Sequence, residues 1–233
     1  MTQNAASFPQ TLYQPEPGAA QILLVRHGQS APFVPDEPFE LLGGHGDPHL
    51  TDLGHHQAEL VGARLASEPI DAIYVSSLTR THQTAAPLAR RLGLDLLVEP
   101  DLREVYLGDA EGGFLRQMMA DEHPAVLAMR ANEEWGEIPG AETTDQFMSR
   151  TVGAVERIAE ANADRFVVAF CHGGVIGAVL AHVTGSRPFA FNGARHTSIS
   201  HLVVNPTGWV MRSFNDGSHA GTLTRDHAHP TSS

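Results

Sequence analysis

The sequence predicts an α/β protein, a three-layer α/β/α sandwich with a mostly parallel central sheet and its active site at the carboxyl ends of the strands. Two observations support this prediction. Short, continuous apolar runs recur along the chain, as in strands that are buried on both faces. Helical patterns alternate with these runs, which is typical of doubly wound sheets, where ligands bind beyond the carboxyl ends of the strands.

The individual elements follow from that alternation. We expect strands at Gln21–Gly28, Ala72–Val75, Leu94–Val98, Phe166–Cys171 and Ile199–Val204. We expect helices at Thr51–Ser67, Leu78–Leu92, Thr143–Ala163 and Val175–Val183, with shorter helical pieces at Phe114–Met119 and Ala125–Arg130. Thr51 is suited to cap the first helix, and a Pro-Gly turn precedes the third.

The domain organisation is predicted from length and from breaks in the alternation. At about 150 residues per domain, 233 residues fit a single α/β domain. Residues 1–20 contain three Pro and no periodic pattern, so we expect a flexible N-terminal arm, and residues 218–233 are expected to form a polar C-terminal tail. Between them, the domain of residues 21–217 contains two irregular insertions, residues 31–48 and 109–139, which we expect at the rim of the site.

The composition excludes several classes of function. All 15 basic residues are Arg, which excludes chemistry that needs an ε-amine, such as a Walker P-loop or a pyridoxal-phosphate Schiff base. The 27 acidic residues bring the net charge to −12, which argues against nucleic acid as a partner. The single cysteine excludes a disulfide framework and a four-cysteine zinc site. The first twenty residues do not resemble a signal peptide and no apolar run could span a membrane, so we expect a soluble, cytoplasmic protein.

Four short motifs contain residues suited to chemistry on an anion. RHGQ at residues 26–29 ends the first predicted strand, where an arginine can clamp an anion beside a nucleophilic histidine. CHGG at residues 171–174 lies between a strand and a helix, whose N-terminus favours a bound anion. SSLTRTHQTA at residues 76–85 places an arginine one turn into a helix, and LREVYLGDAEG at residues 102–112 supplies a carboxyl group. Each motif alone also fits ordinary surface or core residues, whereas two histidines at equivalent strand ends favour a functional interpretation.

Taken together and in this order, the motifs resemble the histidine phosphatase (phosphoglycerate mutase-like) superfamily. That family shows R-H-G-[EQ], S-S-x-x-R-x-x-x-T-A, L-x-E-x-x-x-G-x-x-E-G and a late H-G, and the resemblance spans about residues 21–217. DPHLTDLG at residues 47–54 also resembles the segment with which the family starts its first helix.

The resemblance implies a metal-independent phosphatase without a cofactor that forms a phosphohistidine on His27. It implies that Glu104 protonates the leaving group and then activates water, while two arginines and a second histidine hold the phosphate. The residues assigned to catalysis are His27, Glu104, His172, Arg26 and Arg80, and those assigned to substrate binding are Gly28, Gln29 and Gly173. We expect a small phosphorylated substrate in spite of the negative net charge, because charges beyond about 8 Å are screened at physiological salt. A homodimer is left open.

The chain departs from the family pattern near the site. Residues 31–46 lack the family's asparagine and read G-H-G instead of Q-G, and His196 stands where relatives often carry Asn. These changes leave the nucleophile and the clamp intact, and with the absence of Lys they favour a phosphatase over a phosphoglycerate-type mutase. The alternative from another class is a silent relative that binds phosphorylated ligands or a partner, although such a relative is expected to have lost a catalytic residue.

Other uses of cysteine and histidine find less support. Cys171 lacks the C-x₅-R pattern of a cysteine phosphatase and is interpreted as a small buried strand residue. His45 and His49 lie in a proline-containing loop, so a helical zinc pairing is unsupported. The histidines expected to be incidental are His55, His56, His227 and His229.

Overall fold

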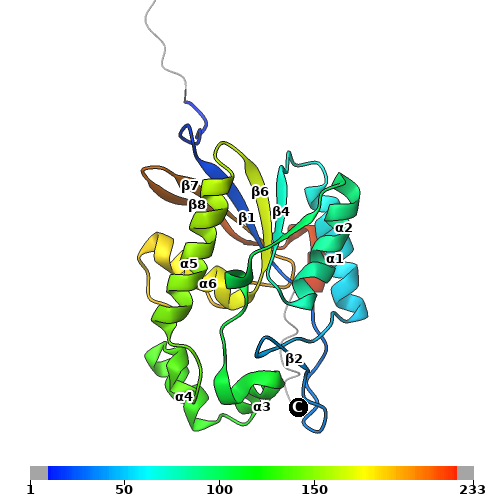
Figure 1. Ribbon diagram of the computed structural model, residues 1–233, viewed down its shortest axis with the longest axis vertical. Coiled ribbons are helices and arrows are strands. Elements are labelled where there is room, and N and C mark those ends of the chain that lie inside the picture. The colour runs from blue at the N-terminus through cyan, green and yellow to red at the C-terminus, as the bar shows by residue number, and fades with distance from the viewer. Residues whose placement is uncertain (1–9, 225–233) are drawn as a thin grey trace, which may run out of the picture.

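A computed structural model describes residues 10–224 and contains a central six-stranded sheet in the order β5-β4-β6-β1-β7-β8 (Figure 1). The strands are β1 (Ala20–Arg26), β4 (Ala72–Val75), β5 (Leu96–Val98), β6 (Phe166–Cys171), β7 (Ile199–Asn205) and β8 (Gly208–Asp216). β1, β4, β5 and β6 run parallel to one another, whereas β7 runs antiparallel to both of its neighbours, β1 and β8. The mostly parallel sheet predicted from the sequence is therefore confirmed.

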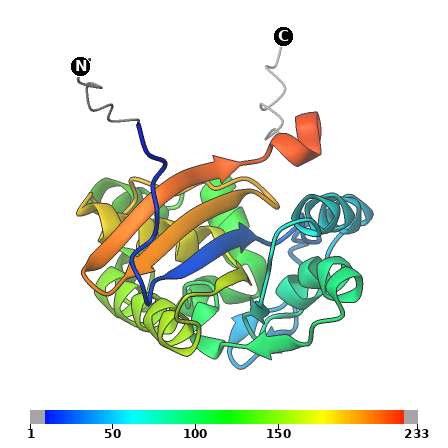
Figure 2. The ribbon, with the colours of Figure 1, turned by 90° about the horizontal axis from the view of Figure 1, so that it is seen from above.

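Helices cover both faces of the sheet and complete the three predicted layers (Figure 2). On one face lie α1 (Asp52–Leu65) and α2 (Thr79–Leu92), and on the other lie α5 (Thr144–Ala161) and α6 (Gly173–Thr184). The side chains of β1 alternate between the two faces. Ile22 and Leu24 belong to the core beneath α5 and α6, whereas Leu23 and Val25 belong to the core beneath α1 and α2. Because both faces are covered, the strand is apolar at every one of these positions.

Local capping sets the helix boundaries. The side chain of Thr51 accepts a hydrogen bond from the N–H of Gly54 at the start of α1, as predicted. Thr143 and Gln146 form a reciprocal capping box at the start of α5. α6 begins at Gly173, earlier than predicted, because its glycine-rich first turn carries no apolar periodicity.

β8 is the one strand of the six-stranded sheet that the sequence does not reveal. It lies at the edge of the sheet and pairs only with β7. None of its residues is fully buried, so no continuous apolar run marks it. An edge strand with one open side needs less apolar character than a central strand, and pattern reading misses it for that reason.

The predicted arm and tail are only partly described. Residues 1–9 and 225–233, with His227 and His229, lie outside the described part of the chain. Residues 10–19 contain no helix or strand. Ser218–Thr224 forms 3₁₀ turns beside α1 and Ala220 is buried, so this part of the predicted tail belongs to the folded domain. No helix within residues 10–224 is long and apolar enough to cross a membrane.

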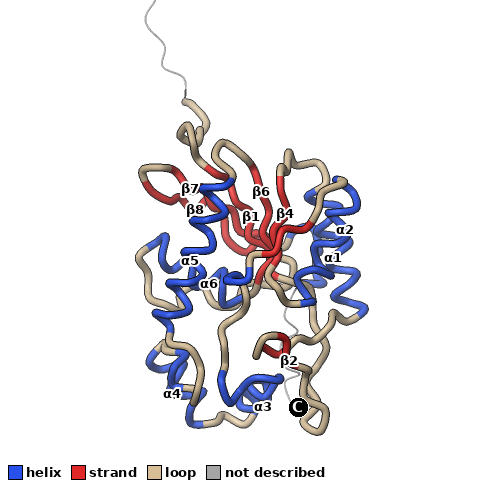
Figure 3. Tube along the Cα trace, in the orientation of Figure 1, coloured by secondary structure: helices blue, strands red, loops and turns tan. Residues whose placement is uncertain are grey.

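The two insertions lie at the same end of the molecule, below the sheet in the views of Figures 1 and 3. The first contains a small hairpin, β2 (Leu41–Leu42) and β3 (His45–Gly46), and the second contains α3 (Phe114–Ala120) and α4 (Pro124–Asn132). The rings of Phe33, Phe39 and Phe114 join them through edge-to-face contacts, with centroids 5.1 to 6.0 Å apart. The insertions therefore form one joint rim.

Candidate active site

A cavity of about 630 Å³ opens beyond the carboxyl end of β1. Of the predicted catalytic residues, four line it: Arg26, His27, Arg80 and Glu104. Both insertions supply its outer wall, through Pro32, Phe39, His45, Glu111, Leu115 and Arg116. The sequence motifs thus converge on one cavity, and the predicted rim surrounds it.

The two histidines lie side by side because of the strand register. β1 and β6 are parallel neighbours in which Arg26 lies opposite Cys171, so His27 and His172 follow equivalent strand ends. Their rings meet edge to face, with centroids 5.1 Å apart. His172 is fully buried behind His27 and does not line the cavity.

His27 is held as a neutral imidazole with a defined proton position. Its Nδ1 lies 2.7 Å from the carbonyl oxygen of Gly28, which can only accept, so Nδ1 carries the proton and Nε2 is unprotonated. Burial, followed by the charges of Arg80 and Arg26, lowers the pKa of His27 well below its ordinary value. An imidazole with an unprotonated nitrogen at neutral pH is the form that a nucleophile requires.

His172 is also neutral, and one of its nitrogens is uncommitted. Its Nε2 lies 2.9 Å from the hydroxyl of Ser76, whereas its Nδ1 has no hydrogen-bond partner among residues 10–224. Burial, followed by the charge of Arg80, lowers the pKa of His172. If the Ser76 hydroxyl donates to Nε2, Nδ1 carries the proton and is a hydrogen-bond donor.

Arg80 is oriented by the first insertion. Asp47 accepts hydrogen bonds from the backbone N–H and the hydroxyl of Thr79 at 2.8 and 2.6 Å, which caps the start of α2. Nη1 of Arg80 lies 3.7 Å from Asp47 Oδ1 and donates to the carbonyl of Gly46 at 2.9 Å. Burial lowers the pKa of Arg80 to about 10, so its guanidinium still carries a full charge at neutral pH.

Arg26 is anchored by the segment before β7. Its Nη1 donates to the carbonyl of Ala194 at 2.5 Å, and its backbone carbonyl accepts from the N–H of Thr197 at 3.0 Å. Gly173 packs beside the guanidinium, since a Cβ there would lie 3.4 Å from Nε of Arg26. These contacts direct a second cation toward His27.

The residues assigned to substrate binding differ in position. Gln29 lines the cavity, whereas Gly28 and Gly173 do not. The N–H of Gly28 donates to Thr84 at 3.0 Å, and a Cβ at Gly28 would lie 2.6 Å from the carbonyl oxygen of Gly54. The structure therefore gives Gly28 a packing role, since it lets the loop approach α1 closely, whereas a Cβ at Gly173 would be in ordinary contact with Arg26.

The carboxyl group of Glu104 is bound to the start of α6. Oε1 accepts from the N–H of Val105 at 3.0 Å, and Oε2 accepts from the N–H of Gly174 at 3.2 Å. A Cβ at Gly174 would overlap Oε1, so a larger residue at this position would displace the carboxyl group. The carboxyl group thus reaches the cavity that contains His27 from a different element of the fold.

Arg116 is a cavity residue that the sequence did not identify. Its Nη1 and Nη2 donate to the carbonyl of Ala31 at 2.5 Å and to the hydroxyl of Ser30 at 2.9 Å. Burial and the charge of Arg26 lower its pKa, and no carboxylate within residues 10–224 forms a salt bridge with it. In the sequence it is one more polar position of α3, and no local signal distinguishes it from a solvated arginine.

Two histidines noted only as departures from the family pattern also line the cavity. The ring centroid of His196 lies 6.2 Å from that of His27, and burial with the charges of Arg26 and Arg116 lowers its pKa to about 3. His45 is buried against Tyr106, and burial lowers its pKa as well. Both are therefore neutral near pH 7.

Cys171 and the two histidines of α1 have the surroundings expected from the sequence. Cys171 is fully buried at the end of β6 and burial raises the pKa of its thiol, in agreement with a structural strand residue. His55 and His56 are exposed on α1, as expected. No group of three or more His, Cys, Asp or Glu side chains within the described residues could hold a metal ion.

Relatives of known name match most of the chain. It is 31% identical over 206 residues to phosphoglycerate mutase-like protein 4 of Arabidopsis thaliana, with 86% of each chain covered. It is 28% identical over 212 residues to the metal-independent phosphoserine phosphatase of the same plant, with 89% of this chain and 86% of the relative covered.

Solved structures and a family profile agree with these matches. A mycobacterial glucosyl-3-phosphoglycerate phosphatase superposes with a TM-score of 0.70 at 27% identity, covering 84% of this chain and 99% of that chain. A phosphoglycerate mutase from Bacillus anthracis shares the fold, with a TM-score of 0.74 at 20% identity and 90% and 98% coverage. The sequence profile of the histidine phosphatase superfamily (branch 1) matches residues 22–217. The chain therefore belongs to the histidine phosphatase superfamily, whose members act on phosphate groups.

Proposed function

We propose that the protein is a phosphatase that hydrolyses small phosphate monoesters through a phosphohistidine on His27. The observation that carries this proposal is the neutral, buried His27, with Nε2 unprotonated, between the charges of Arg26 and Arg80. A neutral imidazole attacks without a separate base, and the two guanidinium groups stabilise the charge on the transferring phosphoryl group. The phosphatase-named relatives support the same activity.

In the first half of the reaction, Nε2 of His27 forms a bond to phosphorus while the bond between phosphorus and the ester oxygen breaks. The carboxyl group of Glu104, in its acid form, gives its proton to that oxygen, and the alcohol leaves. We assign to His172, which lies buried behind His27 with its Nδ1 unpaired among residues 10–224, the role of a hydrogen-bond donor to a phosphoryl oxygen in the loaded site. Arg26 and Arg80 supply the positive charge that this step needs.

In the second half, a water molecule attacks phosphorus and the Glu104 carboxylate accepts a proton from it. The bond between phosphorus and Nε2 of His27 breaks, and inorganic phosphate leaves. The cycle thus restores a neutral His27 and a protonated Glu104. One carboxyl group acts first as acid and then as base, as microscopic reversibility requires.

Trapping the intermediate tests this proposal. Purified protein in EDTA is mixed with a ³²P-labelled phosphate monoester and quenched in alkali. We expect labelled protein whose label is stable in alkali and lost in acid, together with steady release of inorganic phosphate. Turnover without a labelled protein, or turnover abolished by EDTA, would contradict the mechanism.

A phosphoglycerate-type mutase is the second candidate, favoured by the relative named phosphoglycerate mutase-like protein 4. The two activities differ in whether water reaches the phosphohistidine. Incubation with 3-phosphoglycerate separates them, because a phosphatase releases phosphate and glycerate whereas a mutase forms 2-phosphoglycerate. Isomer formation without phosphate release would replace the phosphatase proposal.

A further inference from the structure

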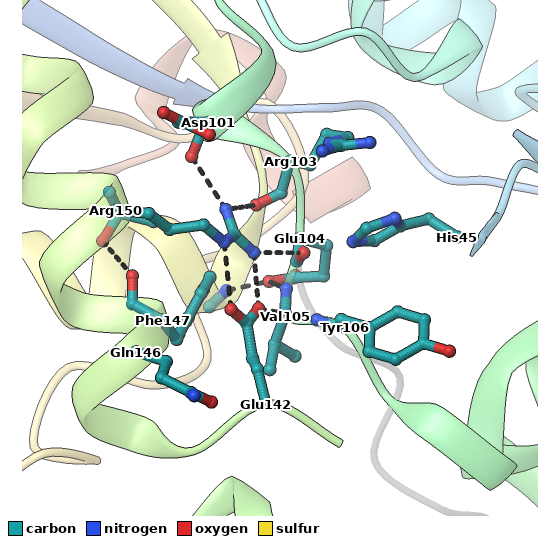
Figure 4. Close-up of polar contacts among 12 residues, drawn as sticks. His45, Asp101, Arg103, Glu104, Val105, Tyr106, Glu142, Gln146, Phe147 and Arg150 are labelled. Atoms are coloured by element: carbon teal, nitrogen blue, oxygen red, sulfur yellow. Dashed lines mark hydrogen bonds and ion pairs between the residues drawn. The ribbon is translucent and has the colours of Figure 1, made fainter. Parts of the chain in front are cut away.

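The segment that carries Glu104 is held by one arginine of α5, Arg150 (Figure 4). Its Nη1 donates to the carbonyls of Asp101 and Arg103 at 2.8 and 2.9 Å. Its Nη2 donates to the carbonyl of Glu104 at 2.8 Å and to Oε1 of Glu142 at 2.6 Å, while Nε donates to Oε2 of Glu142 at 3.0 Å. A guanidinium has five N–H groups, and all five have an acceptor here.

Glu142 fixes the other side of the same segment. Its Oε1 also accepts from the N–H of Tyr106 at 2.7 Å, and its backbone N–H donates to the carbonyl of Tyr106 at 3.0 Å. The Arg150–Glu142 ion pair is largely shielded, with side chains 21% and 13% exposed. The buried ring of Phe147 packs against the guanidinium at 4.8 Å. The pair therefore has little freedom to move.

These contacts enclose the peptide group that orients the Glu104 carboxyl. Oε1 of Glu104 accepts from the N–H of Val105, which lies between the carbonyl held by Arg150 and the N–H of Tyr106 held by Glu142. A shift of this segment would carry the carboxyl with it. Proton transfer is sensitive to such shifts, since a displacement of about 1 Å can cost about a hundredfold in rate.

We propose that Arg150, acting with Glu142, is a positioning residue that places the Glu104 carboxyl against the leaving-group oxygen. The inference rests on the proposed function, in which Glu104 is the general acid. In this proposal α5 contributes to the reaction, through Arg150, as well as to the stability of the fold.

Arg157, two turns further along α5, is a matched control. It bonds Oε1 of Glu99 and Oδ2 of Asp101 at 2.8 and 2.7 Å, so it also ties α5 to the segment that precedes Glu104. Its side chain is half exposed, and it contacts carboxylates and none of the backbone groups around Glu104. Its loss loosens the attachment of α5 without releasing the general acid.

The test compares Arg150→Met, Arg150→Lys and Arg157→Met with the wild type on glycerol phosphate and on p-nitrophenyl phosphate. Only the alkyl ester needs a proton on its leaving oxygen. We expect Arg150→Met to slow the alkyl ester about tenfold to a hundredfold more than the aryl ester, and Arg150→Lys to give a smaller change in the same direction. Arg157→Met should leave the ratio of the two rates unchanged. In a Glu104→Gln background, Arg150→Met should add no further selectivity.

Equal slowing of both esters by Arg150→Met, or the same selectivity from Arg157→Met, would reduce Arg150 to a structural role. If Arg150→Met does not fold, the rates on the two esters are compared for Arg150→Lys and Glu142→Gln instead. A wild-type protein that hydrolyses neither ester would overturn the proposed function itself, which is a distinguishable result.

Discussion

The floor and the rim of the cavity are built in different ways. His27 on the floor and His172 directly behind it are placed by the register of two central parallel strands, and both are buried. On the rim, residues 31–48 and 109–139 meet through single hydrogen bonds, such as that from the N–H of Gly46 to Glu111 at 2.7 Å. We therefore expect the sheet to determine the chemistry and the contacts of the rim to determine which substrate fits. Changes on the floor should abolish turnover, whereas changes on the rim should alter substrate preference.

The largest effect is expected from removing the nucleophile on the floor. His27→Ala should lower kcat by roughly a thousandfold or more and abolish labelling of the protein by ³²P, since His27 is the group proposed to carry the phosphoryl group. Steady-state hydrolysis of an aryl phosphate measures this. His55→Ala, an exposed histidine of α1, is the control and should retain full activity. Full turnover by His27→Ala would show that another group is the nucleophile.

A smaller loss should follow from moving the general acid. Gly174→Ala places a Cβ where Oε1 of Glu104 lies and so displaces the carboxyl group. We therefore expect kcat for an alkyl phosphate to fall about a hundredfold. Gly153→Ala in the middle of α5 is the control, because a Cβ there meets only the end of the Arg157 side chain. Unchanged kinetics in Gly174→Ala would show that the Glu104 carboxyl is free to move without consequence.

On the rim, Arg116 should affect binding more than chemistry. Its guanidinium lines the cavity and forms no salt bridge with a carboxylate of residues 10–224, so we expect it to attract anionic substrates in the ground state and the transition state alike. Arg116→Gln should raise KM about tenfold, the equivalent of about 1.4 kcal/mol, with little change in kcat. The effect should weaken as salt rises. Arg130→Gln, at an exposed position of α4, is the control. A fall in kcat at constant KM would instead indicate that Arg116 acts in the chemical step.

The smallest effect concerns stability in acid. The pKa values of His27, His172 and His196 are lowered, so the unfolded chain binds protons that the folded chain does not. Their contribution to stability is complete above about pH 6.5 and is lost as the pH falls below it. His196→Asn should therefore lose roughly 1 kcal/mol less stability than the wild type between pH 7 and pH 5, measured by urea unfolding. His55→Asn should match the wild type, and equal losses in all three proteins would mean that His196 is protonated in the folded state.

Most of the fold could be predicted because the central strands are buried on both faces. β1, β4 and β6 read as unbroken apolar runs for that reason, and Thr51 reveals the start of α1 through its own side chain. β8 escaped prediction because none of its residues is fully buried and no continuous apolar run marks it. The turns at Ser218–Thr224 escaped because small residues such as Ala220 pack without an apolar period.

The residues of the site also differ in whether they could be predicted from the sequence. The motif residues follow strand ends or lie one turn into a helix. The parallel sheet therefore brings their side chains together at one edge. Arg150 and Arg116 could not be predicted in this way, because their partners are backbone carbonyls 46 to 49 and 85 residues away in the chain. Backbone carbonyls are the same in every sequence and leave no local signal. Long-range hydrogen bonds of this kind become visible only in the folded molecule.

The position of Cys171 has a consequence for oxidative conditions. The thiol lies directly before His172, fully buried, and burial keeps it protonated. Peroxides and alkylating reagents attack thiolates that they can reach, so they find no target here. The proposed phosphatase, with a histidine nucleophile and its only thiol shielded, should keep working without a reductant, under conditions that inactivate enzymes with a cysteine nucleophile.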